Sequence, residues 1–502
     1  MELDNTVATQ IIYDKTEIPI TLELNLKLFR LLTQNDVLMS QVRIRIEQLI
    51  EALLSTLGIP GIPGLTFSAL SEKTFEDKSD TDSISGKQLL QLSIHEEYCD
   101  YPDDLLRGVH SLMETSPLLL ASNPAYILSW LEQLFQASNT DEAEVSTRRA
   151  TEFLGQTCVE ILKLRPSVML ALPQVEAYCF RLSTFAEEEK VDLKKTQPEW
   201  FLPLLRSILD SGISIADIRK ICEVLSSSTA LQRSQEDLCE MLIANLIPPH
   251  IEIQFPLDYL KELTTGNAQK GPEQFAMLRK EFFEESGMRF PPFRFVAVEE
   301  LRYPCFAFKL NSLTTLPFVG LKSNQDFLPV TAPGPSKDAI HSENEILNPL
   351  NDKVSILVEY QPDNPENTFT ARQLDYFLLC FKATLKKHKA RFVNLNFVHE
   401  QLKLLGSSQP ALLELLRSRL SDEQLTHIMR VLVTENVSIR DMHYLFERLL
   451  DYLFLSTDPE HNSVLAYPLS RALSPVKTLN NDQGNVVQFL KESMKRTDLL
   501  AI

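Results

Sequence analysis

Two short stretches carry a serine hydroxyl followed three positions later by a carboxylate. Ser214 precedes Asp217, and Ser438 precedes Asp441. A serine and an acid can act as nucleophile and acid in hydrolysis, but such a pair needs a positioned base, usually histidine. No histidine stands at a defined spacing from these serines. Because Ser-x-x-Asp is also typical of a helix N-terminus, capping accounts for both pairs and we expect no catalytic role.

Other signatures of catalysis or cofactor binding are missing from the sequence. Gly86-Lys87 lacks the upstream glycine and the following Ser or Thr of a phosphate-binding loop. The seven cysteines form no Cys-x-x-Cys, the nine histidines form no His-Glu-x-x-His, and no Gly-x-Ser-x-Gly occurs. We therefore expect a protein that is not an enzyme and that binds neither a metal nor a cofactor.

The strongest positive cluster lies near the end of one expected helix. Its members, beside His388, are Lys382, Lys386, Lys387, Lys389 and Arg391. Lysines at a helix C-terminus usually interact with the helix dipole and keep the surface soluble. The alternative is a patch that binds an acidic protein partner, and both interpretations stay open at this point.

Composition excludes several classes of partner. The chain has 502 residues, enough for two to four domains, and its 44% hydrophobic and 23% charged fractions are those of a globular protein. The formal net charge of −19 opposes binding to nucleic acid or to an anionic membrane surface. Seven cysteines, an odd number without paired spacing, favour reduced thiols in a cytoplasm. No signal peptide or apolar membrane-spanning run is recognisable, so we expect a soluble, cytoplasmic protein.

The serine-acid pairs belong to two near copies of one helix-to-helix joint. The copies are Ser-Gly-Ile-Ser-Ile-Ala-Asp-Ile at 211–218, the first joint, and Glu-Asn-Val-Ser-Ile-Arg-Asp-Met at 435–442, the second joint. Each predicts a helix stop in the left-handed conformation, then a serine N-cap with an acid completing a capping box. The predicted structural caps are Gly212, Ser214 and Asp217, and Asn436, Ser438 and Asp441.

The similarity continues beyond the joints at a constant offset of 224 positions, since 438 − 214 = 224. Apolar residues recur on both sides at helical spacing, with Ile208 answering Leu432 and Ile221 answering Leu445. We interpret this as an internal duplication. A DNA-binding helix-turn-helix is the alternative, but the second helices carry acids, Glu223 and Glu447, where DNA requires donors.

The rest of the chain predicts an α+β fold, mostly helical, with two tandem modules. Each half is expected to begin with an alternating strand, at residues 18–28 and 251–258, then a helix, a Gly-Pro stop and another strand. Polar loops at 71–86 and 321–352 each precede a strand, 88–95 and 353–360, and these strands are taken as equivalent. The predicted domains are 1–146 and 250–370 as α+β modules, with 147–249 and 371–502 as helical subdomains, the last including a tail.

The order of these motifs resembles the FHIPEP family, the flagellar and type III secretion export-gate proteins. The second joint, with Asp458-Pro459 behind it, is similar to part of that family's cytoplasmic domain. So is Ile251-Glu-Ile-Gln-Phe followed by Gly287-Met-Arg-Phe-Pro-Pro. The resemblance covers residues 251–473 well and residues 18–246 as a weaker copy. Family members carry a membrane region, which we do not find here.

The resemblance implies a bacterial protein-interaction module in protein secretion. Its partners would be export-gate subunits, export chaperones or secreted substrates. The grooves between α+β and helical parts, and the two polar loops, would be the docking segments. Homo-oligomerisation and peripheral association through a membrane export complex are left open. The alternative is a scaffold or regulator that kept this fold outside an export apparatus.

Overall fold

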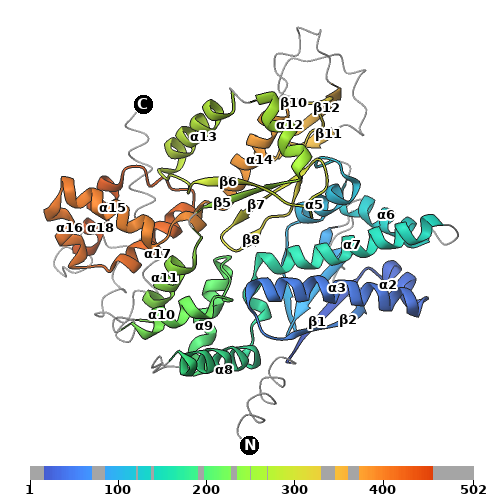
Figure 1. The fold of residues 1–502 in the computed structure, drawn as a ribbon, viewed down its shortest axis with the longest axis horizontal. Coiled ribbons are helices and arrows are strands. Elements are labelled where there is room, and N and C mark those ends of the chain that lie inside the picture. Colours follow the sequence, from blue (N-terminus) through green and yellow to red (C-terminus); the bar gives the residue numbers. More distant parts are fainter. Residues whose placement is uncertain are drawn as a thin grey trace, which may run out of the picture. The chain divides into compact units, whose positions relative to one another are not determined.

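The computed structural model describes ten stretches of the chain (Figure 1). They are residues 16–70, 85–119, 122–136, 141–189, 197–227, 234–248, 250–267, 270–329, 345–359 and 372–455. Most of the polar loop 71–86, and the tail of the last helical subdomain, lie outside the described residues. None of the helices in these stretches is long and apolar enough to cross a membrane.

The protein is a mixed α+β fold in which helices predominate, as the sequence predicts. The helices of the first half are α2 (Leu26–Thr33), α3 (Asp36–Leu57), α4 (Gly86–Leu89), α5 (Asp103–Glu114), α6 (Pro124–Gln136), α7 (Asp141–Leu164), the 3₁₀ turn η2 (Pro166–Met169), α8 (Leu172–Glu188), α9 (Pro198–Asp210), α10 (Ile218–Ser226) and α11 (Gln235–Leu246). Those of the second half are α12 (Leu257–Asn267), α13 (Lys270–Ser286), α14 (Gln373–Lys387), the 3₁₀ turn η6 (Lys389–Phe392), α15 (Leu395–Ser408), α16 (Pro410–Arg417), α17 (Asp422–Thr434) and α18 (Met442–Leu455).

The first sheet has the strand order β2-β1-β3-β4. Its strands are β1 (Glu17–Leu24), β2 (Ile62–Ala69), β3 (Leu90–Ile94) and β4 (Glu97–Cys99). β1 pairs in parallel with β2 and antiparallel with β3. The alternation predicted for β1 is confirmed, since Ile18, Ile20, Leu22 and Leu24 are at most 1% exposed. The strand ends earlier than predicted because Asn25 caps α2, its side chain accepting a bond from the Lys27 amide.

The second sheet repeats this arrangement. Its order is β6-β5-β7-β8, with β9 also paired to β7. The strands are β5 (Ile251–Phe255), β6 (Phe293–Ala297), β7 (Cys305–Leu310), β8 (Leu313–Thr314) and β9 (Phe318–Val319). β5 pairs in parallel with β6 and antiparallel with β7. The counterpart of β3 is therefore β7, and the predicted equivalence of strands 88–95 and 353–360 is wrong. The sequence did not reveal β7, because Cys-Phe-Ala-Phe-Lys-Leu is buried at nearly every position and lacks alternation.

A third, antiparallel sheet occupies part of the region predicted as the loop 321–352. Its order is β10-β12-β11, with β10 (Gln325–Pro329), β11 (Glu345–Leu347) and β12 (Val354–Glu359). Leu347 also donates its amide to the Leu118 carbonyl at 2.8 Å. The loop prediction is wrong for β10 and β11, whose short apolar runs stand among many prolines and polar residues.

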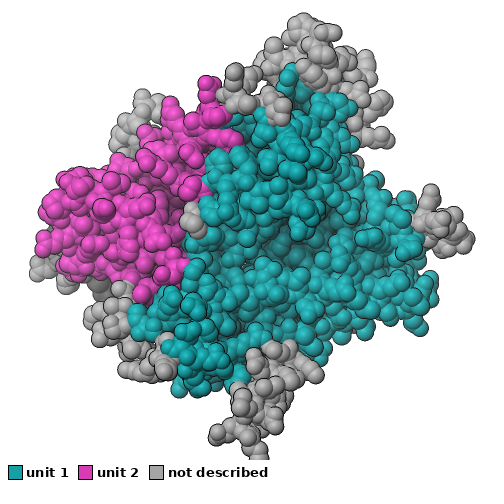
Figure 2. Space-filling model, in the orientation of Figure 1, with its two compact units in different colours: residues 1–232, 246–271, 293–383 teal, residues 233–245, 272–292, 384–502 magenta. Residues whose placement is uncertain are grey.

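The chain forms two compact units, coloured separately in Figure 2. Unit 1 comprises residues 1–232, 246–271 and 293–383, and unit 2 comprises residues 233–245, 272–292 and 384–502. Unit 1 therefore contains the α+β elements of both halves. Nearly all of α11 lies in unit 2, although the sequence assigns it to the helical subdomain 147–249.

Candidate interaction site

The two joints end their first helices in the same way. Gly212 and Asn436 both adopt the left-handed conformation, with φ of 72° and 61°. In the first joint the Ile213 amide reaches back to the Ile208 carbonyl at 3.3 Å, and in the second the Val437 amide reaches Leu432 at 2.9 Å. This six-to-one bond marks the Schellman motif, so the structure confirms both predicted helix stops.

The N-caps lie three residues beyond the predicted serines. Asp217 caps α10 by accepting a bond from the Lys220 amide at 3.2 Å, and Asp441 accepts from the Tyr444 amide at 3.0 Å at the start of α18. The prediction that Ser214 and Ser438 are N-caps is wrong. Their hydroxyls accept instead from the amides two positions on, within a turn that precedes each helix.

Each joint is held by the end of the helix that precedes the parallel strand of its half. The Ile215 amide donates to the Leu57 carbonyl at 2.8 Å, and the Ile439 amide donates to the Ser286 carbonyl at 3.0 Å. The next residues, Gly58 and Gly287, have φ of 77° and 78°. A Cβ there would lie 2.4 Å from the Ala216 amide nitrogen and 2.1 Å from that of Arg440. Only glycine permits this approach.

An arginine braces the helix before each joint. Arg206 on α9 donates twice to the Leu170 carbonyl, at 2.9 and 2.8 Å, and Arg430 on α17 donates twice to Val393, at 3.1 and 3.0 Å. Both carbonyls follow a 3₁₀ turn, η2 or η6.

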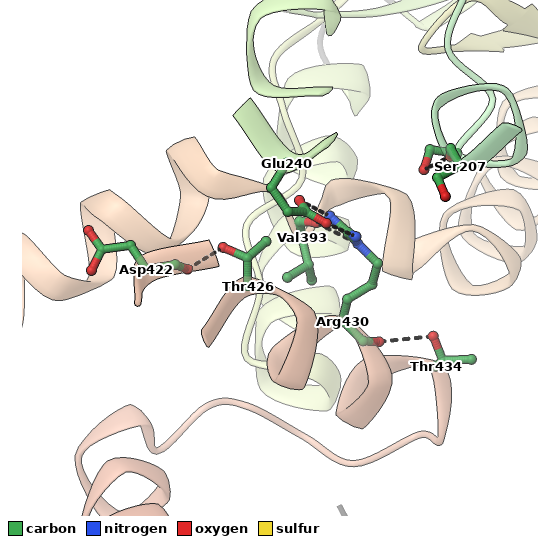
Figure 3. A network of polar contacts seen from close by, with 8 residues as sticks. Ser207, Glu240, Val393, Asp422, Thr426, Arg430 and Thr434 are labelled. Carbon is green, nitrogen blue, oxygen red and sulfur yellow. Dashed lines mark hydrogen bonds and ion pairs between the residues drawn. The ribbon is translucent and has the colours of Figure 1, made fainter. Parts of the chain in front are cut away.

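Arg430 also forms a two-pronged ion pair with Glu240 of α11, at 2.5 and 2.7 Å (Figure 3). Glu240 is 7% exposed, so this pair is largely withdrawn from water. Sequence reasoning missed these arginines because it compared only caps and apolar positions. The signal was present, since 430 − 206 equals the same 224-residue offset.

Two members of the predicted basic cluster, Lys389 and Lys386, contact the second joint and the end of the helix that holds it. Lys389 donates to the Asn436 side-chain oxygen at 2.7 Å, and Lys386 pairs with Glu285 at 2.7 Å. Burial, and then the nearby Lys386, lower the pKa of Lys389. Burial also lowers the pKa of the Arg391 guanidinium. Lys387 is the exposed member, and Arg440 adds an exposed cation within the joint itself. Lys382 also interacts with another residue.

His388 follows Lys387 in the chain and is half-buried. Burial, with further contributions from Arg391 and Lys387, lowers the pKa of its imidazole to about 3. The ring is therefore neutral at physiological pH. It adds no positive charge to the surface that Lys387 and Arg440 present.

This arrangement can bind a partner through charge and through backbone hydrogen bonds. It offers exposed cations and backbone groups at a rigid turn. The cysteines of the described stretches are buried, and burial raises the pKa of Cys222 to about 11 and of Cys158 to about 12, which disfavours the thiolate. No group of three His, Cys, Asp or Glu side chains in the described part of the chain could hold a metal ion.

The comparison with protein-family models gives a match to the second half of the chain. Residues 243–475 match the model of the FHIPEP family. A search of curated proteins found no match.

Several solved structures are similar to this chain at low identity. Nonameric EPEC SctV-C is 15% identical with a TM-score of 0.34, over 49% of this chain and 65% of that chain. The Chlamydia pneumoniae CdsV protein is 14% identical with a TM-score of 0.36, over 48% and 64%. The Shigella flexneri MxiA protein is 16% identical with a TM-score of 0.32, over 49% and 65%. This chain thus spans less than two thirds of each of these structures. The second joint, Arg430 and the basic cluster all lie within residues 243–475, the part of the chain that is similar to the FHIPEP family.

Proposed function

We propose that this chain is a non-enzymatic, cytoplasmic interaction protein of a bacterial type III or flagellar secretion system. The observation that carries the proposal is the FHIPEP match over residues 243–475. Its partners are export-gate subunits, export chaperones or secreted substrates. The printed description of one similar structure, a complex of Chlamydia pneumoniae CdsV with CdsO, concerns those proteins, and CdsO is one kind of partner to seek here.

We further propose that the chain contains two tandem copies of the family's module. The support is the repetition of unrelated details at equivalent places. The two sheets share one pattern of parallel and antiparallel pairing, and both joints have the same helix stop, the same aspartate cap and the same glycine approach. The arginine brace recurs at the same offset. These features do not depend on one another, so their joint recurrence favours duplication over convergence.

The partner-binding surface that this proposal assigns is the exposed edge of the second joint, with Lys387 and Arg440. Although the whole chain is acidic, these exposed cations attract an acidic partner. They raise the rate of encounter and set the orientation of the partner. Lys386 and Lys389 are less suitable for a test, since each is already bound within unit 2 and its loss would disturb the joint.

The test is affinity purification of the tagged full chain from its own cells, with quantitative mass spectrometry. We compare the wild type with Lys387→Glu/Arg440→Glu and with Lys403→Glu, a charge reversal at an exposed position of α15. Recovery of gate subunits, chaperones or substrates with the wild type and the α15 control, reduced at least tenfold in the double variant, supports the proposal. Absence of all export components from the wild-type sample would overturn it, leaving the scaffold or regulator interpretation.

A further inference from the structure

The hairpin of β7 and β8 covers the first joint, and both belong to unit 1. Two residues, Asn311 and Ser312, form the turn between the paired strands. Only Asn311 has a positive φ, 57°, which is the pattern of a type II′ turn. The Ser312 amide donates to the Gly212 carbonyl at 3.1 Å, and the Ser312 hydroxyl accepts from the Ser214 amide at 2.9 Å. The turn thus satisfies two backbone groups of the joint.

Two more contacts hold this hairpin on the first joint. The Asn311 side chain donates to the Ser211 carbonyl at 3.2 Å, and the Lys163 ammonium donates to the Thr314 carbonyl at 3.1 Å. With the hairpin in place, Ile213 of the joint is 0% exposed. The first joint is therefore an occupied docking site for a β-hairpin, and its occupant comes from the same chain.

The second joint has the same helix stop but no such cover within the described stretches. The counterparts of the two bonded backbone groups are the Asn436 carbonyl and the Ser438 amide. Neither has a hydrogen-bond partner among the described residues. Asn436 is exposed and Val437 is half-buried, whereas the matching residues Gly212 and Ile213 are buried. The two groups that a hairpin satisfies in the first joint are thus open in the second.

Cations lie beside the open joint, within the same unit 2. Lys386 stands three residues before η6, as Lys163 stands three residues before η2. Its ammonium pairs with Glu285 at 2.7 Å and its side chain is 40% exposed. Because an ammonium has three donors, Lys386 retains the capacity to donate to a hairpin carbonyl as Lys163 does. Lys387 and Arg440 are exposed and carry further positive charge.

The turn of this chain that corresponds in position to 311–312 does not fit the open joint. It lies between β3 and β4 and consists of His95 and Glu96. Both residues have a positive φ, 49° and 67°, which is the pattern of a type I′ turn. The central peptide of a type I′ turn is flipped relative to type II′, so the amide of the second residue points the opposite way. The 311–312 turn is itself engaged in its own chain, so the occupant has to come from a different protein.

We infer that the second joint is a docking site for the β-hairpin of a partner protein with a two-residue type II′ turn. The first turn residue is Gly or Asn, which tolerate a positive φ. The second is Ser, Thr or Asp, because its side chain accepts from the Ser438 amide while its own amide donates to the Asn436 carbonyl. Asp is preferred, since Lys387 and Arg440 attract a carboxylate. The inference rests on the proposed function for the existence of a partner and names the structure by which that partner is recognised.

Cyclic peptides test the docking site with the purified full-length chain. The probe is a backbone-cyclised peptide of residues 308–315, whose ends already pair because the Thr315 amide donates to the Phe308 carbonyl at 2.8 Å. Two further peptides carry Ser312→Asp and Ser312→Ala. Fluorescence anisotropy of the labelled peptides should show the Asp peptide binding at least tenfold more tightly than the Ala peptide, with the Ser peptide between them. No binding, or equal affinity of the three peptides, would overturn the inference.

Variants of the chain test the position of the site. Lys387→Glu/Arg440→Glu should weaken binding of the Asp peptide at least tenfold and of the Ser peptide much less, because only the first carries a carboxylate at the turn. Lys403→Glu, the exposed control on α15, should change neither affinity. Equal effects of the double variant and the control would contradict docking at the second joint.

Hydrogen exchange locates the bound peptide independently of these substitutions. A saturating amount of the Asp peptide should slow exchange of the Ser438 amide at least tenfold. The Ser214 amide should not change, because its own hairpin already covers it. Slower exchange elsewhere in the chain without an effect at Ser438 would place the peptide at another site and overturn the inference.

The peptide measurements and the recovery of partners from cells fail independently. Purified chain that binds none of the peptides would remove the hairpin site, while export components recovered from cells would still support the proposed function. Peptide binding at Ser438 without any export component in the cellular sample would retain the hairpin site and remove the assignment to secretion.

Discussion

Arg206 and Arg430 make the same carbonyl bonds in different surroundings. Arg430 has in addition the carboxylate of Glu240, which its removal would leave buried without a countercharge. Breaking one side of a buried pair costs about 3–5 kcal/mol, whereas loss of charged hydrogen bonds alone costs about 1.5–3 kcal/mol. Comparing alanine substitutions at the two positions therefore separates the contribution of the carbonyl bonds to stability from that of the ion pair.

We expect Arg430→Ala to destabilise unit 2 by more than Arg206→Ala destabilises unit 1. Both tryptophans of the chain, Trp130 and Trp200, lie in unit 1, so tryptophan fluorescence follows that unit while far-UV circular dichroism follows both. Arg430→Ala should lower the midpoint temperature of the first unfolding transition seen by circular dichroism. The midpoint temperature seen by tryptophan fluorescence should change little. The paired variant Arg430→Ala/Glu240→Ala should recover part of the loss. No recovery would mean that Glu240 gains nothing from the arginine.

His388 gives unit 2 a dependence on pH. Its pKa is about 3 in the folded chain and near 6.5 when unfolded, because burial opposes the charged form. The unfolded state then binds the extra proton, so stability is complete above pH 6.5 and declines as the pH falls toward 3. We expect His388→Gln to flatten the fall in midpoint temperature between pH 7 and 5. Identical slopes for the wild type and the variant would contradict a lowered pKa of the His388 imidazole.

At the scale of elements, each joint depends on a glycine that lets the backbone of the joint approach the end of the preceding helix closely. We expect Gly58→Ala and Gly287→Ala each to lower stability by more than about 1 kcal/mol, the usual cost of a side chain at positive φ, because a Cβ would also meet backbone atoms. Gly271→Ala is the control, since no atom lies within 4 Å of its added Cβ inside α13. Hydrogen exchange should show loss of protection at Ile215 for the first variant and at Ile439 for the second.

The caps can be separated by single alanine substitutions. Asp441→Ala should cost about 1 kcal/mol, typical of a lost N-cap, while Ser438→Ala should cost less because its hydroxyl accepts only a long bond of 3.4 Å. In the first joint Ser214→Ala should cost more than Ser438→Ala, since the Ser214 hydroxyl also donates to the Thr56 carbonyl. Urea unfolding of the three variants checks the order, and a larger effect at Ser438 than at Asp441 would show that the serine is the N-cap.

Local signals were enough to predict the joints, and distant contacts explain the errors. The helix stops at Gly212 and Asn436 depend on backbone conformation that those residues favour by themselves. The Ser214 hydroxyl also donates to the Thr56 carbonyl, 158 residues earlier, a contact that no local pattern predicts. The basic cluster was visible in the sequence, but the pairing of Lys389 with Asn436 and Lys386 with Glu285 was not, because it depends on how α13, α14 and α17 meet.

At the scale of the molecule, the two halves of the sequence are not the two units of the structure. α11 ends the first half, yet Glu240 pairs with Arg430, and the Ala244 carbonyl accepts from the side chain of Asn396. Periodicity predicts a helix at this place but does not say which apolar surface it covers. The predicted boundary at residue 249 therefore divides unit 2.

We expect a fragment of residues 250–502 to be less stable than one of residues 233–502. Both lack residues 1–232, but only the shorter one also lacks α11 and leaves Arg430 without Glu240. Circular dichroism and hydrogen exchange at α17 compare the two, and a synthetic peptide of residues 233–247 added to the shorter fragment should restore protection. Equal protection without the peptide would show that α11 is dispensable for unit 2.

The separation of 190 residues between Glu240 and Arg430 also sets an order of events on the ribosome. At about 5–20 residues per second, α11 emerges roughly 10–40 s before the helix it pairs with has been synthesised. During that interval Leu238, Leu242 and Ile243, which unit 2 finally buries, have no completed surface to cover. Nascent chains of this protein thus pass through a period in which α11 is a natural target for chaperones. Synonymous codon changes that slow translation after residue 246 lengthen this period.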